Sequence, residues 1–319
     1  MCGIAGVIYK QASGPTGADL LRMLHGCQHR GPDSTGLALY GSQAEQLIFR
    51  IFLDADLSHA PESWPSRRDR VEQILKDYGF QIESSQLQRA FLRINGIYEP
   101  GTSADPQVVS YAVEETLGVE IFSAGYSLEV IKDEGTADDL DQRFGCRSFT
   151  GTHGIGHVRL ATESDVNPST AHPFWAYGFN DVAIVHNGQI TNYFKLKRCL
   201  EQRGYRFRTE NDSEVIAVYL ADKMANGIAM DEALEQSLSE LDGTFSFLVA
   251  TPEAIGYAKD SIGAKPMVVC ETDDLVAVGS EEVSLHQLAG HQKLDSFEPF
   301  PGTSHTWSRS TQVPSLSAT

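Results

Sequence analysis

The sequence has few cysteines, and none of them belongs to a paired motif. The five cysteines lie at positions 2, 27, 146, 199 and 270, so no Cys-x-x-Cys pair occurs. This spacing disfavours both a paired-cysteine zinc site and a secreted disulfide framework. No phosphosugar, nucleotide or flavin motif is visible either. We therefore expect no metal, no cofactor in this chain and a reducing, cytoplasmic location.

Long apolar runs and basic surfaces are also lacking. No stretch of 18 apolar residues occurs, and the start carries no basic segment followed by an apolar one. Lysine and arginine total 25 against 43 acidic residues, which gives a net charge of −18. Such a charge disfavours binding to nucleic acid or to an anionic membrane. Small-molecule or protein partners are favoured instead.

The periodic patterns that are present indicate a mixed chain of 319 residues, long enough to bury a sizeable core. Helical spacing occurs at 18–29, 67–78, 193–203, 213–225 and 230–241. Strand-like runs occur at 36–40, 156–162, 181–186, 244–250, 255–259, 267–270 and 275–278. The runs 244–250 and 255–259 are close enough to form an antiparallel hairpin. The pattern predicts an α+β protein with antiparallel sheets rather than regular βαβ units.

Residues 41 to about 150 differ from the rest of the chain. They contain 19 acidic and 10 basic residues and turn-rich segments such as 99–106, although 122–133 has the pattern of two strands around Gly125. Two interpretations stay open for this acidic stretch. It is either a surface elaboration or an added docking or lid region.

Cys2 and four polar clusters raise the question of a site. Cys2 precedes the apolar, glycine-punctuated run 3–9, which predicts a buried strand with a backbone or ligand close by. The clusters are His-Arg-Gly-Pro-Asp-Ser-Thr-Gly at 29–36, His-Val-Arg-Leu-Ala-Thr at 157–162, His-Asn-Gly at 186–188 and Asn-Asp-Ser-Glu at 211–214. Taken singly, the first is a turn, the third a hairpin turn and the fourth a helix cap. In the second, strand alternation places Arg159 on a buried face, which is costly unless an anion pairs with it.

Together, in this order, these pieces resemble the class II glutamine amidotransferases, a branch of the N-terminal nucleophile hydrolases. The resemblance covers residues 1–40 and about 150–285. It implies a four-layer α-β-β-α sandwich of two antiparallel sheets. The implied domain spans 1–285, interrupted by the acidic insertion at about 41–150, and 286–319 is interpreted as a C-terminal tail.

The resemblance also implies a nucleophile and an oxyanion site. After removal of Met1, the Cys2 thiol would attack glutamine while its free α-amine acts as the base. The Asn187 side chain and the Gly188 backbone N–H would stabilise the oxyanion.

The implied substrate contacts select a free amino acid. Arg159 would hold the α-carboxylate of L-glutamine and Asp212 its α-ammonium group, while Thr162 begins a loop, continuing to Phe174, that closes over the substrate. The supporting residues are Arg30, Asp33 and His186.

The resemblance implies glutamine hydrolysis, with ammonia passed to a synthase subunit on another chain. Glutamate-synthase-like assemblies and N-methylglutamate synthase fit this arrangement best. Three alternatives stay open: a free-standing glutaminase, a different N-terminal-cysteine amidohydrolase acting on acyl amides, and a non-catalytic scaffold subunit.

Overall fold

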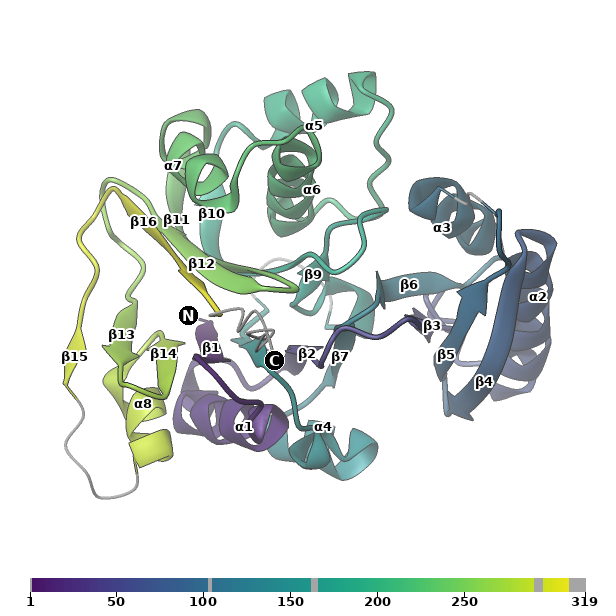
Figure 1. Ribbon diagram of the computed structural model, residues 1–319, viewed down its shortest axis with the longest axis horizontal. Coiled ribbons are helices and arrows are strands. Elements are labelled where there is room, and N and C mark those ends of the chain that lie inside the picture. The colour runs from purple at the N-terminus through teal and green to yellow at the C-terminus, as the bar shows by residue number, and fades with distance from the viewer. Residues whose placement is uncertain (1, 103–104, 162–165, 290–294, 310–319) are drawn as a thin grey trace, which may run out of the picture.

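The structure is a computed structural model that describes residues 2–102, 105–161, 166–289 and 295–309. Two antiparallel sheets stack on each other at its centre, and helices cover their outer faces (Figure 1). The seven-stranded sheet has the order β15 (Ser296–Phe297), β13 (Val268–Glu271), β14 (Leu275–Gly279), β1 (Gly3–Tyr9), β8 (His153–Arg159), β2 (Ser34–Tyr40) and β7 (Leu128–Glu134). The five-stranded sheet has the order β16 (Thr303–Ser308), β12 (Ala254–Lys259), β11 (Gly243–Thr251), β10 (Ala183–Ile190) and β9 (Phe174–Trp175).

The helices form the two outer layers. α1 (Thr16–Gly26), α4 (Ala137–Phe144) and α8 (Glu282–Ala289) lie on the seven-stranded side. α5 (Tyr193–Gln202), α6 (Asp212–Ala225) and α7 (Met230–Glu240) lie on the five-stranded side (Figure 1). The predicted α+β class and four-layer sandwich are confirmed.

Strand β1 shows how the sequence specifies this layering. All seven of its residues are buried, so both of its faces are covered. Ile4 and Ile8 belong to the core shared with the five-stranded sheet, whereas Ala5 and Val7 pack with the residues of α1. Between them, a Cβ atom on Gly6 would lie 2.8 Å from Leu248 Cδ1, so a side chain at this position would have to displace Leu248 between the two sheets.

The acidic stretch 41–150 contributes a third sheet beside the sandwich. Its order is β4 (Phe80–Gln88), β5 (Phe91–Tyr98), β3 (Leu47–Phe52) and β6 (Glu120–Gly125). With α2 (Trp64–Asp77) and α3 (Pro106–Glu114) it forms the lobe at the right of Figure 1. β7 and α4 also lie within these sequence limits but belong to the sandwich. β6 and β7 are the two strands predicted around Gly125.

The stretch from 286 onward, which the sequence suggested was a C-terminal tail, contains regular secondary structure. The second half of α8 and the strands β15 and β16 lie there, and β16 pairs with β12 over six residues. The predicted hairpin of β11 and β12 is present. The hairpin-turn interpretation of Asn187-Gly188 is wrong, because β10 continues in register with β11 to Ile190.

Candidate functional site

Cys2 immediately precedes the first residue of β1 and lies beside the C-terminal end of β8. The antiparallel register pairs Gly3 with Val158, which places Cys2 next to the residues that follow Val158. The backbone N–H of Leu160 donates to Cys2 Sγ at 3.4 Å, and the thiol lies 3.7 Å from the Leu160 carbonyl oxygen. The side chain is only partly buried.

The surroundings of this thiol favour its ionised form. Burial raises the pKa of Cys2. The hydrogen bond and the electrostatic influence of His157, together with the Leu160 amide, lower that pKa by more than burial raises it. The net pKa is about 7, against an ordinary value of 9.0. Thiolates rather than thiols are nucleophiles, so this cysteine is activated near neutral pH. The pKa values of the buried Cys27 and Cys146 thiols are instead raised by burial.

The side-chain amide of Asn187 joins β10 to Cys2. Its Nδ2 donates to the Cys2 carbonyl oxygen at 3.1 Å and to Ser280 Oγ at 3.3 Å. Its Oδ1 lies 3.0 Å from His157 Nε2. Arg30 also holds Cys2, because its Nε donates to the same carbonyl oxygen at 3.0 Å.

Gly188 follows Asn187 in a conformation that requires glycine. Its φ is +134°, and a Cβ atom would lie 2.0 Å from the Thr244 carbonyl oxygen. Thr191 N–H donates to Asp242 across the β10–β11 pair, and hydrogen-bonded positions alternate along an antiparallel pair. The N–H groups of Gly188 and Ile190 therefore both point away from β11. The Ile190 N–H donates to Asp212 Oδ2 at 3.0 Å, so the Gly188 N–H faces the same side as Asp212.

Arg159 lies at the end of β8, close to Cys2. Burial lowers the pKa of its guanidinium from the ordinary value, while Cys2 and Asp33 oppose that shift. Its Nη1 donates to Thr170 Oγ1 at 3.3 Å. Asp33 Oδ2 accepts the backbone N–H of Ala161 at 2.7 Å and so fixes the chain just beyond Arg159. Thr162 and the next three residues of the predicted substrate loop lie outside the described residues.

Asp212 begins α6, and the preceding residue caps that helix. Asn211 Oδ1 accepts the backbone N–H of Ser213 at 2.9 Å, as the cap interpretation of the sequence requires. Burial raises the pKa of Asp212, but His186 and the Ile190 N–H outweigh it, so the net pKa is lowered. His186 Nδ1 lies 3.4 Å from Asp212 Oδ1. Asp212 therefore stays ionised.

Three buried histidines connect the two halves of the site. His157 stacks on His172 with ring centroids 4.3 Å apart. His172 Nε2 and His186 Nδ1 both lie within 3.0 Å of Ser213 Oγ. One contact path thus runs from Asn187 through these rings to α6.

Sequence reasoning did not identify His157, His172 or Ser280 as site residues. His157 had a usable signal, since it lies two residues before Arg159 and so shares a strand face with it. Ser280 had none, because only the pairing of β1 with β14 brings it to Asn187.

The described ranges contain neither a clustered metal site nor a membrane-spanning helix. There, no group of three or more histidine, cysteine, aspartate or glutamate side chains is arranged to hold a metal ion. No described helix is both long and apolar enough to cross a bilayer.

Two known proteins are similar in sequence to nearly the whole of this chain. A family model described as "Glutamine amidotransferase domain" matches residues 157–287. A protein named "Putative glutamine amidotransferase" from Methanothermobacter thermautotrophicus is 39% identical over 94% of this chain and 97% of its own length. The "Glutamine amidotransferase-like protein GlxB" of Rhizobium meliloti is 36% identical over 96% of this chain and 98% of its own length.

A comparison with solved structures supports the fold. A glutamine phosphoribosylpyrophosphate amidotransferase from B. subtilis matches 96% of this chain with a TM-score of 0.58 and 20% sequence identity. The match covers 47% of that structure, so this chain spans about half its length.

Proposed function

Because this chain belongs to the glutamine amidotransferases, we propose that it hydrolyses L-glutamine to glutamate and ammonia through a thioester on Cys2. The observation that carries the proposal is the Cys2 thiol itself. Its pKa is lowered to about 7, the Leu160 N–H donates to its sulfur, and Asn187 Nδ2 holds the backbone carbonyl oxygen of the same residue.

The reaction needs two successive bond exchanges at the side-chain carbonyl carbon of glutamine, C–N for C–S and then C–S for C–O. Cys2 Sγ attacks the side-chain amide carbon, and the carbonyl oxygen takes up negative charge. Collapse of this intermediate breaks the C–N bond, and the nitrogen leaves as ammonia after accepting a proton. Water then attacks the γ-glutamyl thioester, which releases glutamate and returns the thiol.

The base in this scheme is the α-amine of Cys2. In the printed sequence one residue, Met1, precedes Cys2. Its removal frees an amine with a pKa of about 7.7 to 8.0, which is substantially unprotonated near neutral pH. With Met1 attached, that nitrogen is an amide and accepts no proton. Processing therefore separates an inactive form from an active one.

The oxyanion is assigned to Asn187 and Gly188. The Gly188 N–H points away from β11, and oxyanion donors of this kind contribute roughly 3 to 4 kcal/mol each. In the resting structure Asn187 Nδ2 contacts Cys2 O and Ser280 Oγ. One of these two hydrogen bonds is exchanged for the oxyanion during the reaction.

Substrate selection is assigned to two side chains of opposite charge that would both face the α-carbon of glutamine. Arg159 pairs with the α-carboxylate, Asp212 pairs with the α-ammonium group, and Thr162 contributes from the closing loop. A substrate lacking either charge forgoes one of these ion pairs and is bound less well. Arg30, Asp33 and His186 support these groups through the contacts described above.

Ammonia is passed to a synthase subunit on another chain, in an assembly like glutamate synthase or N-methylglutamate synthase. Two relatives of nearly the same length support a self-standing amidotransferase chain. By contrast, the "Glutamine--fructose-6-phosphate aminotransferase" of Mesorhizobium japonicum is matched over only 28% of its length.

The test is glutamine turnover by the purified chain, with and without its co-purifying subunits. We expect Cys2→Ala to abolish turnover and Cys199→Ala, which removes an exposed cysteine, to leave it unchanged. Intact-mass measurement reports whether Met1 has been removed. Full activity of Cys2→Ala would overturn the nucleophile assignment.

The same assay separates the alternatives. Fast turnover without any partner indicates a free-standing glutaminase. Hydrolysis of acyl amides without a free α-amino or α-carboxylate group indicates a different amidohydrolase. A complex whose function is indifferent to Cys2→Ala indicates a scaffold.

A further inference from the structure

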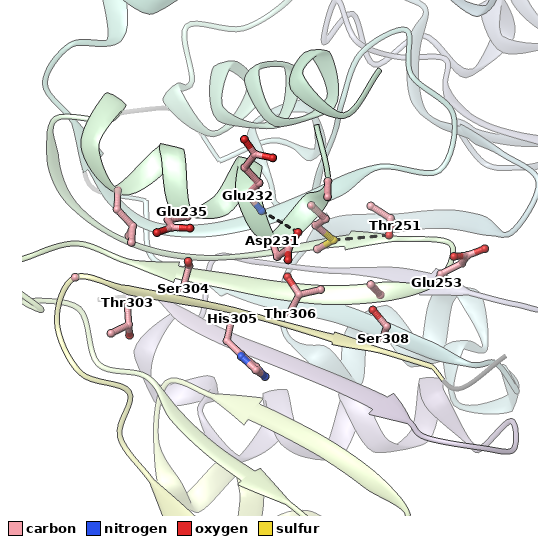
Figure 2. Close-up of a pocket in the computed structure, with 15 residues that line it drawn as sticks. Asp231, Glu232, Glu235, Thr251, Glu253, Thr303, Ser304, His305, Thr306 and Ser308 are labelled. Atoms are coloured by element: carbon pink, nitrogen blue, oxygen red, sulfur yellow. Dashed lines mark hydrogen bonds between the residues drawn. The ribbon is translucent and has the colours of Figure 1, made fainter. Parts of the chain in front are cut away.

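A groove lies far along the chain from the Cys2 site, between α7 and the edge strand β16. It has a volume of about 790 Å³ and is lined by side chains of α7, of β16 and of the turn between β11 and β12. Figure 2 shows Ser304, Thr306 and Ser308 projecting from β16 toward the acidic side chains of α7. His305 projects to the opposite side of the strand.

The backbone of β16 is open along this groove. Within the described ranges β16 has a sheet neighbour on one side only, β12. The Arg309 N–H donates to the Glu253 carbonyl oxygen at 3.0 Å, so the odd-numbered positions of β16 are the hydrogen-bonded ones. The backbone N–H and C=O groups of Ser304, Thr306 and Ser308 therefore point away from β12.

This edge lacks the features by which proteins protect exposed strands. β16 reads Thr-Ser-His-Thr-Trp-Ser, with no proline and no lysine. An edge of this kind is a template for another strand, and strand addition is a common mode of peptide recognition. A further sign is that Thr306 Oγ1 is buried without a hydrogen-bond partner among the described residues.

The charge around the groove indicates what kind of strand fits. Four exposed carboxylates line it, those of Asp231, Glu232, Glu235 and Glu253. None of them forms an ion pair with a described residue, and the lining includes no lysine or arginine. A polypeptide segment with Lys or Arg side chains would supply the missing charge.

We propose that the groove binds an extended Lys- or Arg-bearing segment of a partner polypeptide, which adds as a strand to β16. The proposal rests on the proposed function in one respect: it takes the segment to belong to the synthase subunit that receives ammonia. The chain's own residues 310–319 are a poorer match, since they include no lysine or arginine.

The first test uses the full chain and a labelled synthetic peptide that alternates lysine with valine and threonine. We expect saturable binding by fluorescence anisotropy that weakens as salt is raised. A peptide with glutamate in place of lysine should not bind, and one with methylated backbone nitrogens at alternate positions should bind much more weakly. Equal binding of all three peptides, or no binding of the first, overturns the proposal.

Variants locate the site. Glu232→Gln, Glu235→Gln and Glu253→Gln combined should weaken binding of the lysine peptide about tenfold. A matched triple on the other lobe, Glu45→Gln, Glu62→Gln and Glu115→Gln, removes the same charge and should change little. Equal effects of the two triples mean that the peptide responds only to net charge, which overturns the site.

A proline tests the strand edge directly. Thr306→Pro removes an N–H that points away from β12, so the β12 pairing is retained while the added strand loses a donor. We expect binding to fall at least tenfold, whereas Thr306→Val, which loses only the side-chain hydroxyl, should weaken it much less. If Thr306→Pro unfolds the chain, the methylated peptide still decides the point.

Other occupants give distinct results. Concentration-dependent dimers that Thr306→Pro abolishes indicate a second copy of this chain, and peptide binding that appears only after truncation at Arg309 indicates the chain's own terminus. Either result overturns the proposal. Glutamine turnover is measured on every groove variant and should be unchanged, so failure here is distinguishable from failure of the proposed function.

Discussion

Single residues decide how the Asn187 amide is oriented. Its Nδ2 donates to the Cys2 carbonyl oxygen, so its Oδ1 is the atom that faces His157 and must accept. His157 Nε2 therefore carries the proton. This one hydrogen bond sets the direction of an amide that we assign to the oxyanion, and the same ring lowers the pKa of Cys2.

Replacing His157 should alter the thiol as well as the rate. His157→Phe keeps a ring to stack on His172 but removes the donor and the electrostatic effect on Cys2. We expect kcat to fall roughly tenfold and the thiol pKa to rise above about 7. The pH dependence of iodoacetamide alkylation, measured in a Cys199→Ala background, reports the thiol directly.

The control for this experiment is His305→Phe, a change on an exposed strand position. It should leave both the alkylation profile and kcat unaltered. If His157→Phe shows the same alkylation profile as the unmodified chain, His157 does not act on the thiol, and the positioning role is wrong.

The candidate site residues named from the sequence are those that sit in local motifs. Cys2, Asn187 and Asp212 are each embedded in a short pattern, and the Asn211 cap was predictable from capping chemistry alone. Ser280 and His172 enter the site only through pairing between β1 and β14 and through stacking of rings from separate segments. Such contacts depend on the register of strands far apart in the chain, which no local pattern specifies.

At the scale of elements, β7 positions the segment that contacts Arg159. Lys132 on β7 is buried, and its Nζ donates to the Ala171 carbonyl oxygen at 2.9 Å. It also lies 4.9 Å from the centre of the Phe174 ring. This lysine thus holds the turn η4 (Pro168–Thr170), whose last residue accepts a hydrogen bond from Arg159.

Removing this link should affect substrate binding more than chemistry. Lys132→Met keeps the length and apolar stem while deleting the ammonium group. We expect KM for glutamine to rise about tenfold, since hydrogen bonds from charged groups contribute about 1.5 to 3 kcal/mol, while kcat changes little. Steady-state kinetics separate the two constants.

The free energy of unfolding of Lys132→Met should not fall along with its affinity for glutamine. Burial lowers the pKa of Lys132 to about 8, so its charge is costly to bury, and an apolar replacement of similar size is often tolerated. Lys195→Met on exposed α5 is the control and should leave KM unchanged. An equal loss of kcat with unchanged KM would contradict this positioning role.

Some strands were easier to predict from the sequence than others, for a physical reason. The β11–β12 hairpin has continuous apolar strands around a short turn, so its pattern was readable. β4 reads Phe-Gln-Ile-Glu-Ser-Ser-Gln-Leu-Gln and is an edge strand with one solvated face, so its apolar content is low. The Asn187-Gly188 pair has the composition of a hairpin turn, yet sheet pairing with β11 keeps it in a strand.

At the scale of the whole molecule, polar side chains join the two central sheets. Tyr40 on β2 donates its hydroxyl proton to the Ala250 carbonyl oxygen at 2.7 Å. His153 on β8 stacks on Tyr40, with ring centroids 4.3 Å apart, and its Nε2 lies 2.7 Å from the Thr251 carbonyl oxygen. A carbonyl only accepts, so this nitrogen carries the proton. Both contacts cross from the seven-stranded to the five-stranded sheet.

The bridge at His153 should make the sandwich sensitive to acid. Burial lowers the pKa of His153 from 6.5 to about 4, so between these values the unfolded chain binds more protons than the folded one. The free energy of unfolding therefore rises with pH across this window and falls as pH drops through it. A full shift of this size corresponds to about 3 kcal/mol.

His153→Gln keeps an N–H donor that does not titrate there, so its unfolding free energy should fall less between pH 6.5 and pH 4. Urea unfolding at a series of pH values measures both slopes, and His286→Gln, on the exposed face of α8, should keep the slope of the unmodified chain. Because His172 is also buried with a lowered pKa, some slope remains in His153→Gln. Identical slopes in the two proteins would mean that His153 titrates alike in folded and unfolded chains, which its burial between the sheets does not permit.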